Sequence, residues 1–181
     1  WRHRPAVVSE RIAQVVPEAA IIAILRNPID RAQSALVHHI HGGRLPAGTR
    51  LLDVVRETPP EREQLGLISG GWYAESLVPY RERFGPRLLV LLNDDARREP
   101  ERVYVDALRH IGARTDVIPA GLDERRFSRE AKGEDEVAPP LTAEDRAELW
   151  TYFRDDVAEL ERMFGFDLAA WAPDGEPGVT R

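Results

Sequence analysis

The chain has 181 residues, of which 43% are hydrophobic and 31% are charged. This length and composition suit one globular domain and exclude a fibrous repeat or a wholly disordered chain. The formal net charge of −6 argues against general nucleic-acid binding, because phosphate neutralisation needs a basic face. There is no cysteine, which excludes disulfides and thiolate metal sites, and no apolar run reaches the ~18–20 residues that span a bilayer. We therefore expect no nucleic-acid or membrane partner and a cytoplasmic location.

The chain opens on Trp1-Arg2-His3-Arg4-Pro5, with neither a methionine nor a hydrophobic leader. We interpret this start as lying inside a longer protein, with residues expected before it. Helical spacing of apolar residues predicts a short helix over 9–16, which Pro17 ends. Ala19–Leu25 is a continuous Ile-rich run, which is typical of a parallel strand covered on both faces.

A helix is expected directly after this strand. Arg26 lies at the strand's carboxyl end, and Asn27 follows as a predicted N-cap. Pro28 then occupies the first helical position, and Asp30 lies in the positive first turn. The helix should run to about Ile40.

Further elements alternate along the rest of the chain. An apolar stripe predicts a helix over 73–84, bent at Pro79, and a second buried strand follows over 87–92. Apolar spacing then predicts a helix over 103–111, stopped by Gly112.

The carboxyl third begins with a long polar segment, 119–140, of the kind that is usually functional or mobile. Thr142 and Asp145 have the spacing of a capping box and open a last long helix, which Gly165 ends. The Pro- and Gly-rich residues 173–181 are expected to form a flexible tail.

The alternation of strands and helices predicts an α/β fold with a central parallel sheet. In such folds ligands bind at the carboxyl ends of the strands. We expect a single domain over residues 1–172.

The stretch 21–34 contains the parts of an anion site. It puts the Arg26 guanidinium at a strand tip and the Ser34 hydroxyl about two turns into the next helix, near that helix's positive end. Arginine can offer phosphate a bidentate fork, and serine adds a neutral donor. Taken alone, Arg26 is equally well read as a structural ion-pair partner and Ser34 as a helix-surface residue.

The string Leu-Arg-Asn-Pro-x-Asp-Arg-x-x-Ser over 25–34 resembles the 3′-phosphate-binding motif of the sulfotransferases that use PAPS (3′-phosphoadenosine 5′-phosphosulfate). Downstream, 71–84 is similar to the family's Gly-x-Tyr helix, 87–100 to its next strand and turn, and 141–171 to its closing helix and tryptophan. The resemblance covers nearly the whole chain. It implies a P-loop-like three-layer fold whose amino-terminal portion is missing here.

The resemblance also implies an activity: a transferase that moves a sulfonate group from PAPS to a hydroxyl or amine of a small-molecule or carbohydrate acceptor, without a metal. Arg26 and Ser34 would bind the donor's 3′-phosphate. The family has a late loop that covers the nucleotide, and Phe127, Arg129 and Lys132 occupy the comparable stretch here. Solvated charges in a mobile loop are the alternative interpretation of these three residues.

The family's catalytic lysine belongs to a 5′-phosphosulfate loop that has no counterpart in this chain and would precede Trp1. His3 is a candidate general base because imidazole titrates near neutrality. A histidine on the surface is the alternative.

Four residues are candidates for acceptor binding, with core packing as the alternative for the last of them: His38, His41, Trp72 and Tyr73. The histidines at 38, 39 and 41 do not suit a metal, because neighbours on a helix point about 100° apart.

Two other functional classes stay open. One is a nucleotide kinase with a similar sheet, and the other is a non-catalytic nucleotide-binding or scaffold domain. Residues upstream of Trp1 would discriminate, because a Gly-x-x-x-x-Gly-Lys-Ser/Thr loop would favour the kinase.

Overall fold

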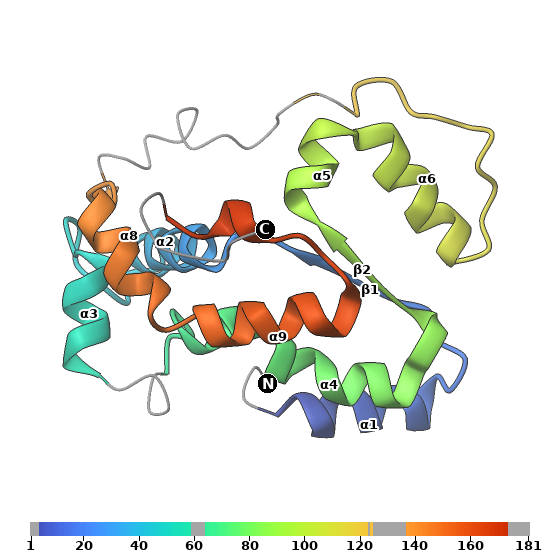
Figure 1. Cartoon of the computed structure of the whole chain (residues 1–181), viewed down its shortest axis with the longest axis horizontal. Coiled ribbons are helices and arrows are strands. Elements are labelled where there is room, and N and C mark those ends of the chain that lie inside the picture. The colour runs from blue at the N-terminus through green and yellow to red at the C-terminus, as the bar shows by residue number, and fades with distance from the viewer. Residues whose placement is uncertain (1–3, 59–63, 123, 125–136, 174–181) are drawn as a thin grey trace. The chain divides into compact units, whose positions relative to one another are not determined.

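The structure is a computed structural model that describes residues 4–58, 64–122, 124 and 137–173. It divides into two compact units, each made of two stretches of chain (Figure 1). The first unit comprises Trp1–Arg26 and Glu75–Arg126, and the second comprises Asn27–Ala74 and Phe127–Arg181. The prediction of one domain over 1–172 stays a prediction.

The first unit is built around two parallel strands. β1 (Ile21–Leu25) pairs with β2 (Leu88–Leu92), with Ile21 opposite Leu88 and Leu25 opposite Leu92. This pairing confirms the expected α/β class with parallel strands. Because the two strands end in register, the residues that follow them, Arg26 and Asn93, leave the sheet at the same edge.

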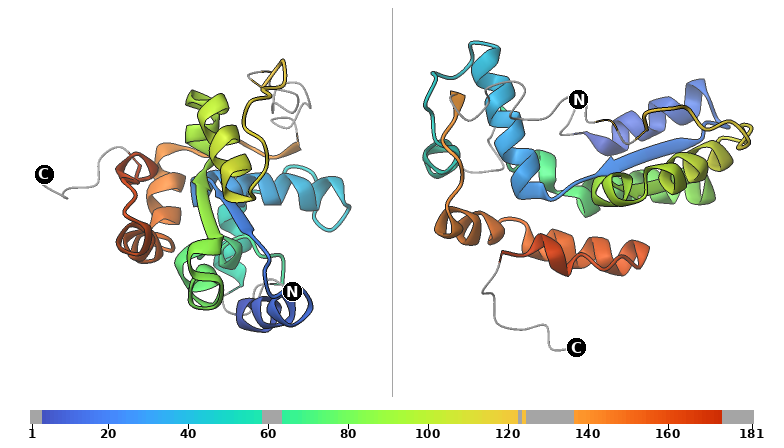
Figure 2. Two further views of the ribbon diagram at one scale, coloured as in Figure 1. Left: turned by 90° about the vertical axis from the view of Figure 1, so that its right-hand side faces the viewer. Right: turned by 90° about the horizontal axis from the view of Figure 1, so that it is seen from above.

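Helices connect and cover the two strands. α1 (Pro5–Val15) precedes β1, and α4 (Tyr73–Phe84) leads through a 3₁₀ turn, Gly85–Arg87, into β2. α5 (Asn93–Arg98) and α6 (Pro100–His110) follow β2. In Figures 1 and 2, α6 lies to one side of the strand pair and α1 and α4 lie to the other.

One face of β1 is open to solvent. Ile22 is 36% exposed and Ile24 is 60% exposed, whereas Leu25 on the alternate face is 6% exposed. The expectation that this strand is covered on both faces is therefore wrong for the described residues. Successive side chains of a strand point to opposite faces, and only the face that carries Leu25 packs into the described core.

The second unit is a cluster of helices around α2 (Pro28–His41). Its other described helices are α3 (Leu51–Glu57), α8 (Ala143–Trp150) and α9 (Arg154–Phe164), with 3₁₀ turns at Ser69–Gly71 and Ala169–Trp171. The largest completely buried side chains of this unit form one apolar core: Ile29, Leu36, Leu51, Leu67, Ile68, Leu149, Phe153 and Leu160.

The closing helix is interrupted. The capping box of Thr142 and Asp145 is confirmed, and so is the end at Gly165, whose φ is +72°. The single long helix that the sequence predicts between them is wrong, because a turn over 151–153 separates α8 from α9. The carbonyl oxygen of Tyr152 there accepts a hydrogen bond from Trp72 Nε1 at 2.9 Å, a partner that lies far away in the sequence.

No helix in the described part of the chain is long and apolar enough to cross a membrane.

Candidate anion-binding site

Arg26 stands where the first unit ends. It directly follows the buried last residue of β1, Leu25, and is itself partly buried. Its neighbour at the sheet edge, Asn93, begins α5. In that helix the Asp95 carboxylate is paired with Arg98 at 2.6 Å and with Arg102 at 3.5 Å.

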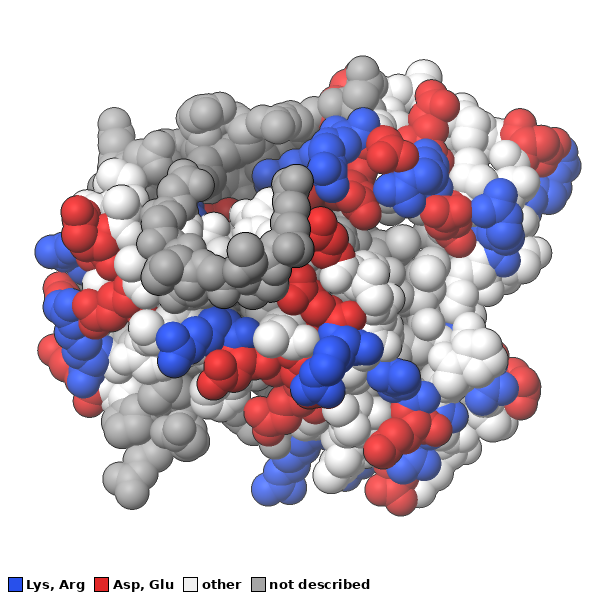
Figure 3. Space-filling view, in the orientation of Figure 1, with Lys and Arg blue, Asp and Glu red and all other residues white. Residues whose placement is uncertain are grey.

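Positive and negative charges alternate along α5 and α6. Arg102 reaches three carboxylates, at distances of 2.5 to 3.5 Å: those of Asp95, Glu99 and Asp106. Figure 3 shows basic and acidic side chains interleaved in the same manner over the face that it draws. The guanidinium groups of Arg98, Arg102 and Arg109 are therefore paired with carboxylates at short range.

Asn27 opens α2 and uses both ends of its amide. Oδ1 accepts hydrogen bonds from the backbone N–H groups of Ile29 at 2.9 Å and Asp30 at 3.5 Å, as a helix N-cap does. Nδ2 donates to the carbonyl oxygen of Trp171 at 2.9 Å. Because Asn27 already satisfies these first-turn amides, an anion at this end of α2 would depend mainly on side chains.

Ser34 lies about two turns into α2 and is partly buried. No described residue forms a hydrogen bond with its hydroxyl. His38 and His41 follow at i+4 and i+7, so all three belong to one stripe of the helix, and both histidines are exposed. This stripe offers a hydroxyl and two imidazoles on the same side of α2.

Two charged residues of the predicted motif are committed to contacts within the second unit. Asp30 pairs with Arg146 at 2.6 Å, which links α2 to α8. Arg31 donates from Nη2 to the carbonyl oxygens of Gly66, at 2.9 Å, and of Leu67. These contacts fasten the amino half of α2 to its surroundings.

Two buried polar side chains on α2, Gln33 and His39, make hydrogen bonds that the sequence did not predict. Gln33 is 1% exposed and donates from Nε2 to the carbonyl oxygen of Pro139 at 2.8 Å. His39 is 4% exposed, with Nε2 2.8 Å from the carbonyl oxygen of Leu65 and Nδ1 3.1 Å from Arg44 Nη1. A guanidinium only donates, so Nδ1 is assigned as the acceptor and Nε2 as the protonated nitrogen.

A signal for both residues was present in the sequence. After Pro28 at its start, the buried positions of α2 follow one helical stripe: 29, 32, 33, 36, 37, 39 and 40. Polar side chains in such a stripe need hydrogen-bond partners, although the sequence does not say which.

Trp72 and Tyr73, predicted to bind the acceptor, also have structural contacts. Trp72 donates its indole N–H to Tyr152, as described above. Tyr73 is buried and meets Trp171 edge to face, with ring centroids 6.2 Å apart. An acceptor role for these two residues stays a prediction.

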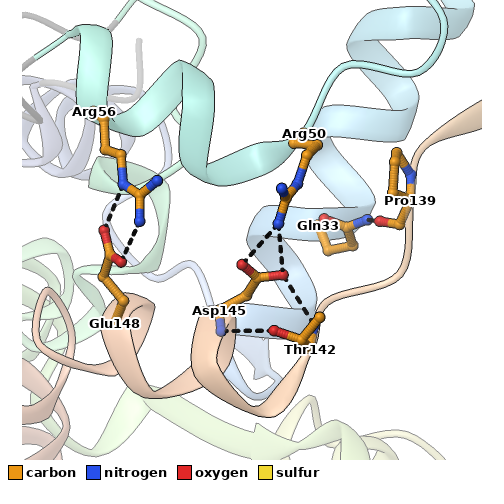
Figure 4. Close-up of polar contacts among 7 residues, drawn as sticks. All are labelled: Gln33, Arg50, Arg56, Pro139, Thr142, Asp145 and Glu148. Atoms are coloured by element: carbon orange, nitrogen blue, oxygen red, sulfur yellow. Dashed lines mark hydrogen bonds and ion pairs between the residues drawn. The ribbon is translucent and has the colours of Figure 1, made fainter.

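α3 and α8 are joined by two ion pairs (Figure 4). Arg50 contacts Asp145 at 3.1 Å, and Arg56 contacts Glu148 at 2.5 Å. The backbone N–H of Thr142 donates to Asp145 Oδ2 at 3.0 Å, and this bond is the main reason that the pKa of Asp145 lies below its usual value. The Arg50 charge lowers the pKa further, against the opposing effect of burial.

Four predicted site residues lie outside the described residues: His3, Phe127, Arg129 and Lys132. Arg26 belongs to the first unit and Ser34 to the second, so their convergence on one anion stays a prediction. Within the described ranges, no group of three or more His, Cys, Asp or Glu side chains could hold a metal ion.

No family model matches the chain. Its sequence is similar to bifunctional heparan sulfate N-deacetylase/N-sulfotransferases. It is 27% identical over 187 residues to bifunctional heparan sulfate N-deacetylase/N-sulfotransferase 3 from Homo sapiens. It is 25% identical over 186 residues to bifunctional heparan sulfate N-deacetylase/N-sulfotransferase 1 from Xenopus tropicalis. These alignments cover 90% and 89% of the chain, which spans about a fifth (21%) of the length of each relative.

The fold is similar to that of a solved sulfotransferase from Alicyclobacillus acidocaldarius. The TM-score is 0.71 at 27% identity, and the match covers 92% of this chain and 62% of that one. Sequence and fold therefore both support a place for this chain among the sulfotransferases.

Proposed function

We propose that the chain is the part of a PAPS-dependent sulfotransferase that binds the 3′-phosphate of the donor nucleotide. The observation that carries the proposal is the junction of β1 and α2, where a strand-tip arginine precedes a capped helix that bears Ser34. The similarity to sulfotransferases over nine-tenths of the chain supports it.

The residue types at the junction suit a phosphate group. The guanidinium of Arg26 is a planar set of hydrogen-bond donors, and the Ser34 hydroxyl forms no hydrogen bond with a described residue. Both groups can donate hydrogen bonds to phosphate oxygens. Two other residues of the motif make structural contacts: Asn27 caps α2, and Arg31 donates hydrogen bonds to the carbonyl oxygens of residues 66 and 67. The proposed division is therefore that Arg26 and Ser34 contact the anion and the remaining motif residues hold α2 in place.

PAPS, when bound, supplies a sulfonate linked through oxygen to its 5′-phosphate. In the proposed reaction an acceptor oxygen or nitrogen forms a bond to sulfur while the bridging S–O bond breaks. The electron pair of that bond leaves on the phosphate of adenosine 3′,5′-bisphosphate, and the acceptor's proton passes to a base. His3 remains our candidate for this base, and the proposal assigns to Arg26 and Ser34 the orientation of the donor.

For the acceptor we propose a carbohydrate amine or hydroxyl. The relatives named as heparan sulfate N-sulfotransferases support this class. The stripe of Ser34, His38 and His41 adds a local reason, because it puts two exposed imidazoles beside the proposed phosphate contact.

Transfer of labelled sulfonate from PAPS tests the proposal. The intact protein that contains this chain is incubated with a heparan-type oligosaccharide carrying free amines and, separately, with its N-acetylated form. We expect label to enter the first oligosaccharide well above the second, and Arg26→Ala to lower kcat/KM by about a hundredfold, since one charged contact to phosphate contributes ~1.5–3 kcal/mol.

Arg97→Ala is the matched control, because Arg97 is an exposed arginine of the same unit. It should keep the wild-type rate. Transfer that is absent with both oligosaccharides and with small alcohols and amines, or that survives Arg26→Ala unchanged, would contradict the proposed function.

A further inference from the structure

Gln33 is a polar residue in an apolar position. It lies in the core-facing stripe of α2, four residues after Ile29 and three before Leu36, both of which are completely buried. Burying an amide without a hydrogen bond costs free energy, so its contacts decide what it contributes. The residue that follows it is Ser34.

Among the described residues, the side-chain N–H of Gln33 has a hydrogen-bond partner and its side-chain carbonyl has none. Nε2 donates to the carbonyl oxygen of Pro139 at 2.8 Å, across 106 positions of the sequence. Oε1 is buried and has no hydrogen-bond partner among the described residues. Within the described ranges the side-chain amide of Gln33 thus makes one hydrogen bond, to the segment that leads into α8.

The segment 137–139 is held from a second side as well. The backbone N–H of Gly48 donates to the carbonyl oxygen of Val137 at 2.8 Å, and Ala138 between the two contacts is buried. The preceding turn of α2 meets α8 through the ion pair of Asp30 and Arg146. Residues 137–146 are therefore tied to the first two turns of α2, by the buried Gln33 amide beside Ser34 and by the Asp30 ion pair one turn before it.

We propose that Gln33 is a positioning residue for the 3′-phosphate contact of Ser34. Its bond to Pro139 fixes this turn of α2 to the segment 137–139, and so fixes the direction of the neighbouring hydroxyl. This inference rests on the proposed function, because it assigns Gln33 a role in the same site. Gln33 itself does not contact the nucleotide.

Removing the Gln33 amide should loosen both partners. In Gln33→Leu the carbonyl oxygen of Pro139 loses its donor. Of the two hydrogen bonds described above, the segment 137–139 then keeps the one from the Gly48 backbone N–H to Val137. Gln33→Glu retains the side-chain shape but puts a carboxylate oxygen where the donor was, and it serves as the second variant should Gln33→Leu fold poorly.

The matched control is His39→Leu. His39 lies on the same helix, is as deeply buried, and makes a bond of the same length from side chain to carbonyl, with Leu65 as its partner. Any general loss of stability from an apolar replacement in α2 should therefore appear in both variants.

The first measurement uses no nucleotide. Hydrogen exchange of the Gly48 amide reports on the segment, because that amide bonds to Val137. We expect exchange to be faster in Gln33→Leu and Gln33→Glu and unchanged relative to neighbouring amides in His39→Leu. Equal protection of Gly48 in the Gln33 and His39 variants would overturn the proposed tie.

The second measurement is the affinity for adenosine 3′,5′-bisphosphate relative to adenosine 5′-phosphate. The Gln33 variants should weaken bisphosphate binding by about three- to tenfold, the range expected for one net hydrogen bond, and leave monophosphate binding within about twofold. His39→Leu should leave the ratio of the two affinities unchanged.

The outcomes separate the two proposals. If the wild-type protein does not prefer the bisphosphate to the monophosphate, the proposed function is refuted, whatever the exchange rate of the Gly48 amide. A wild-type protein that prefers it, with the same preference in the Gln33 variants, refutes the positioning role and leaves the proposed function standing.

Discussion

Asp145 is the residue whose charge has the clearest structural consequence. Its carboxylate accepts from the Thr142 backbone, pairs with Arg50, and is largely buried. Its pKa is lowered in the folded state, chiefly by the Thr142 bond, so folding favours the ionised form. The resulting stability is present above the unfolded pKa of about 3.9 and is lost as the pH falls through the lower folded value.

Asp145→Ala should therefore lower the free energy of unfolding by about 1–2 kcal/mol at pH 7, because it removes the N3 partner of the Thr142 capping box together with the Arg50 ion pair. The difference in the free energy of unfolding between wild type and Asp145→Ala should become smaller as the pH falls below about 4. Urea unfolding at a series of pH values measures both effects. Glu57→Ala, which removes an exposed carboxylate of α3, is the control, and a gap that stays constant down to pH 3 would contradict the linkage.

Local residue roles were predictable from the sequence and distant ones were not. Asn27 as N-cap and the pair of Thr142 and Asp145 depend on neighbours within three residues, and the structure confirms them. The contacts of Arg31 and Gln33 lie 35 and 106 positions away, at backbone carbonyls. A carbonyl leaves no trace in the sequence, since every residue carries one.

At the scale of elements, the 3₁₀ turn at Ser69–Gly71 depends on close approach to its neighbours. A Cβ added at Gly71 would lie 2.7 Å from Phe153 Cε1 and 3.1 Å from Pro28 Cβ. Both neighbours are buried, so neither can move without disturbing the core.

Gly71→Ala should therefore destabilise the fold by about 1–3 kcal/mol through overpacking. Gly42→Ala is the matched control, because Gly42 also has no positive φ and a Cβ there would lie at contact distance from two backbone carbonyl oxygens, 3.4 Å from His38 and 3.7 Å from His39. Chemical denaturation of the two variants measures the difference. Equal stability would show that the turn adjusts to the added methyl.

β1 provides a second comparison within one element. Leu25 points into the core and Ile24, next to it, is mostly exposed. Leu25→Ala should cost about 2–5 kcal/mol, the range for large-to-small changes in a core, and Ile24→Ala less than about 1 kcal/mol. Equal losses in denaturant unfolding would mean that the outer face of β1 is covered in solution.

Two element predictions failed and one helix, α5, was not predicted, for related reasons. An apolar run such as Ile21–Leu25 indicates a strand, but its exposure depends on which elements pack against it. The break between α8 and α9 coincides with the contact from Trp72, and a helical period cannot foresee such a contact. α5 was not predicted because Asn93–Arg98 is polar apart from Ala96 and has no apolar stripe.

At the scale of the whole molecule, the order of elements and the parallel pairing of β1 with β2 were predictable, since both follow from the alternation of strand and helix patterns. The division into two units was not, because each unit joins stretches of chain that are far apart in sequence. The border falls between Arg26 and Asn27, inside the motif on which the proposed function depends.

The central claim is that Arg26 and Ser34 together recognise the 3′-phosphate of the donor, and titration of the intact protein with two nucleotides tests it most directly. Adenosine 3′,5′-bisphosphate and adenosine 5′-phosphate differ only in that phosphate. We predict that wild type binds the bisphosphate at least tenfold more tightly, which corresponds to about 1.4 kcal/mol, and that Arg26→Ala and Ser34→Ala each remove most of this preference. Ser76→Ala is the control for the loss of a helical hydroxyl and should keep the preference. Equal affinity of the wild-type protein for the two nucleotides would contradict the account.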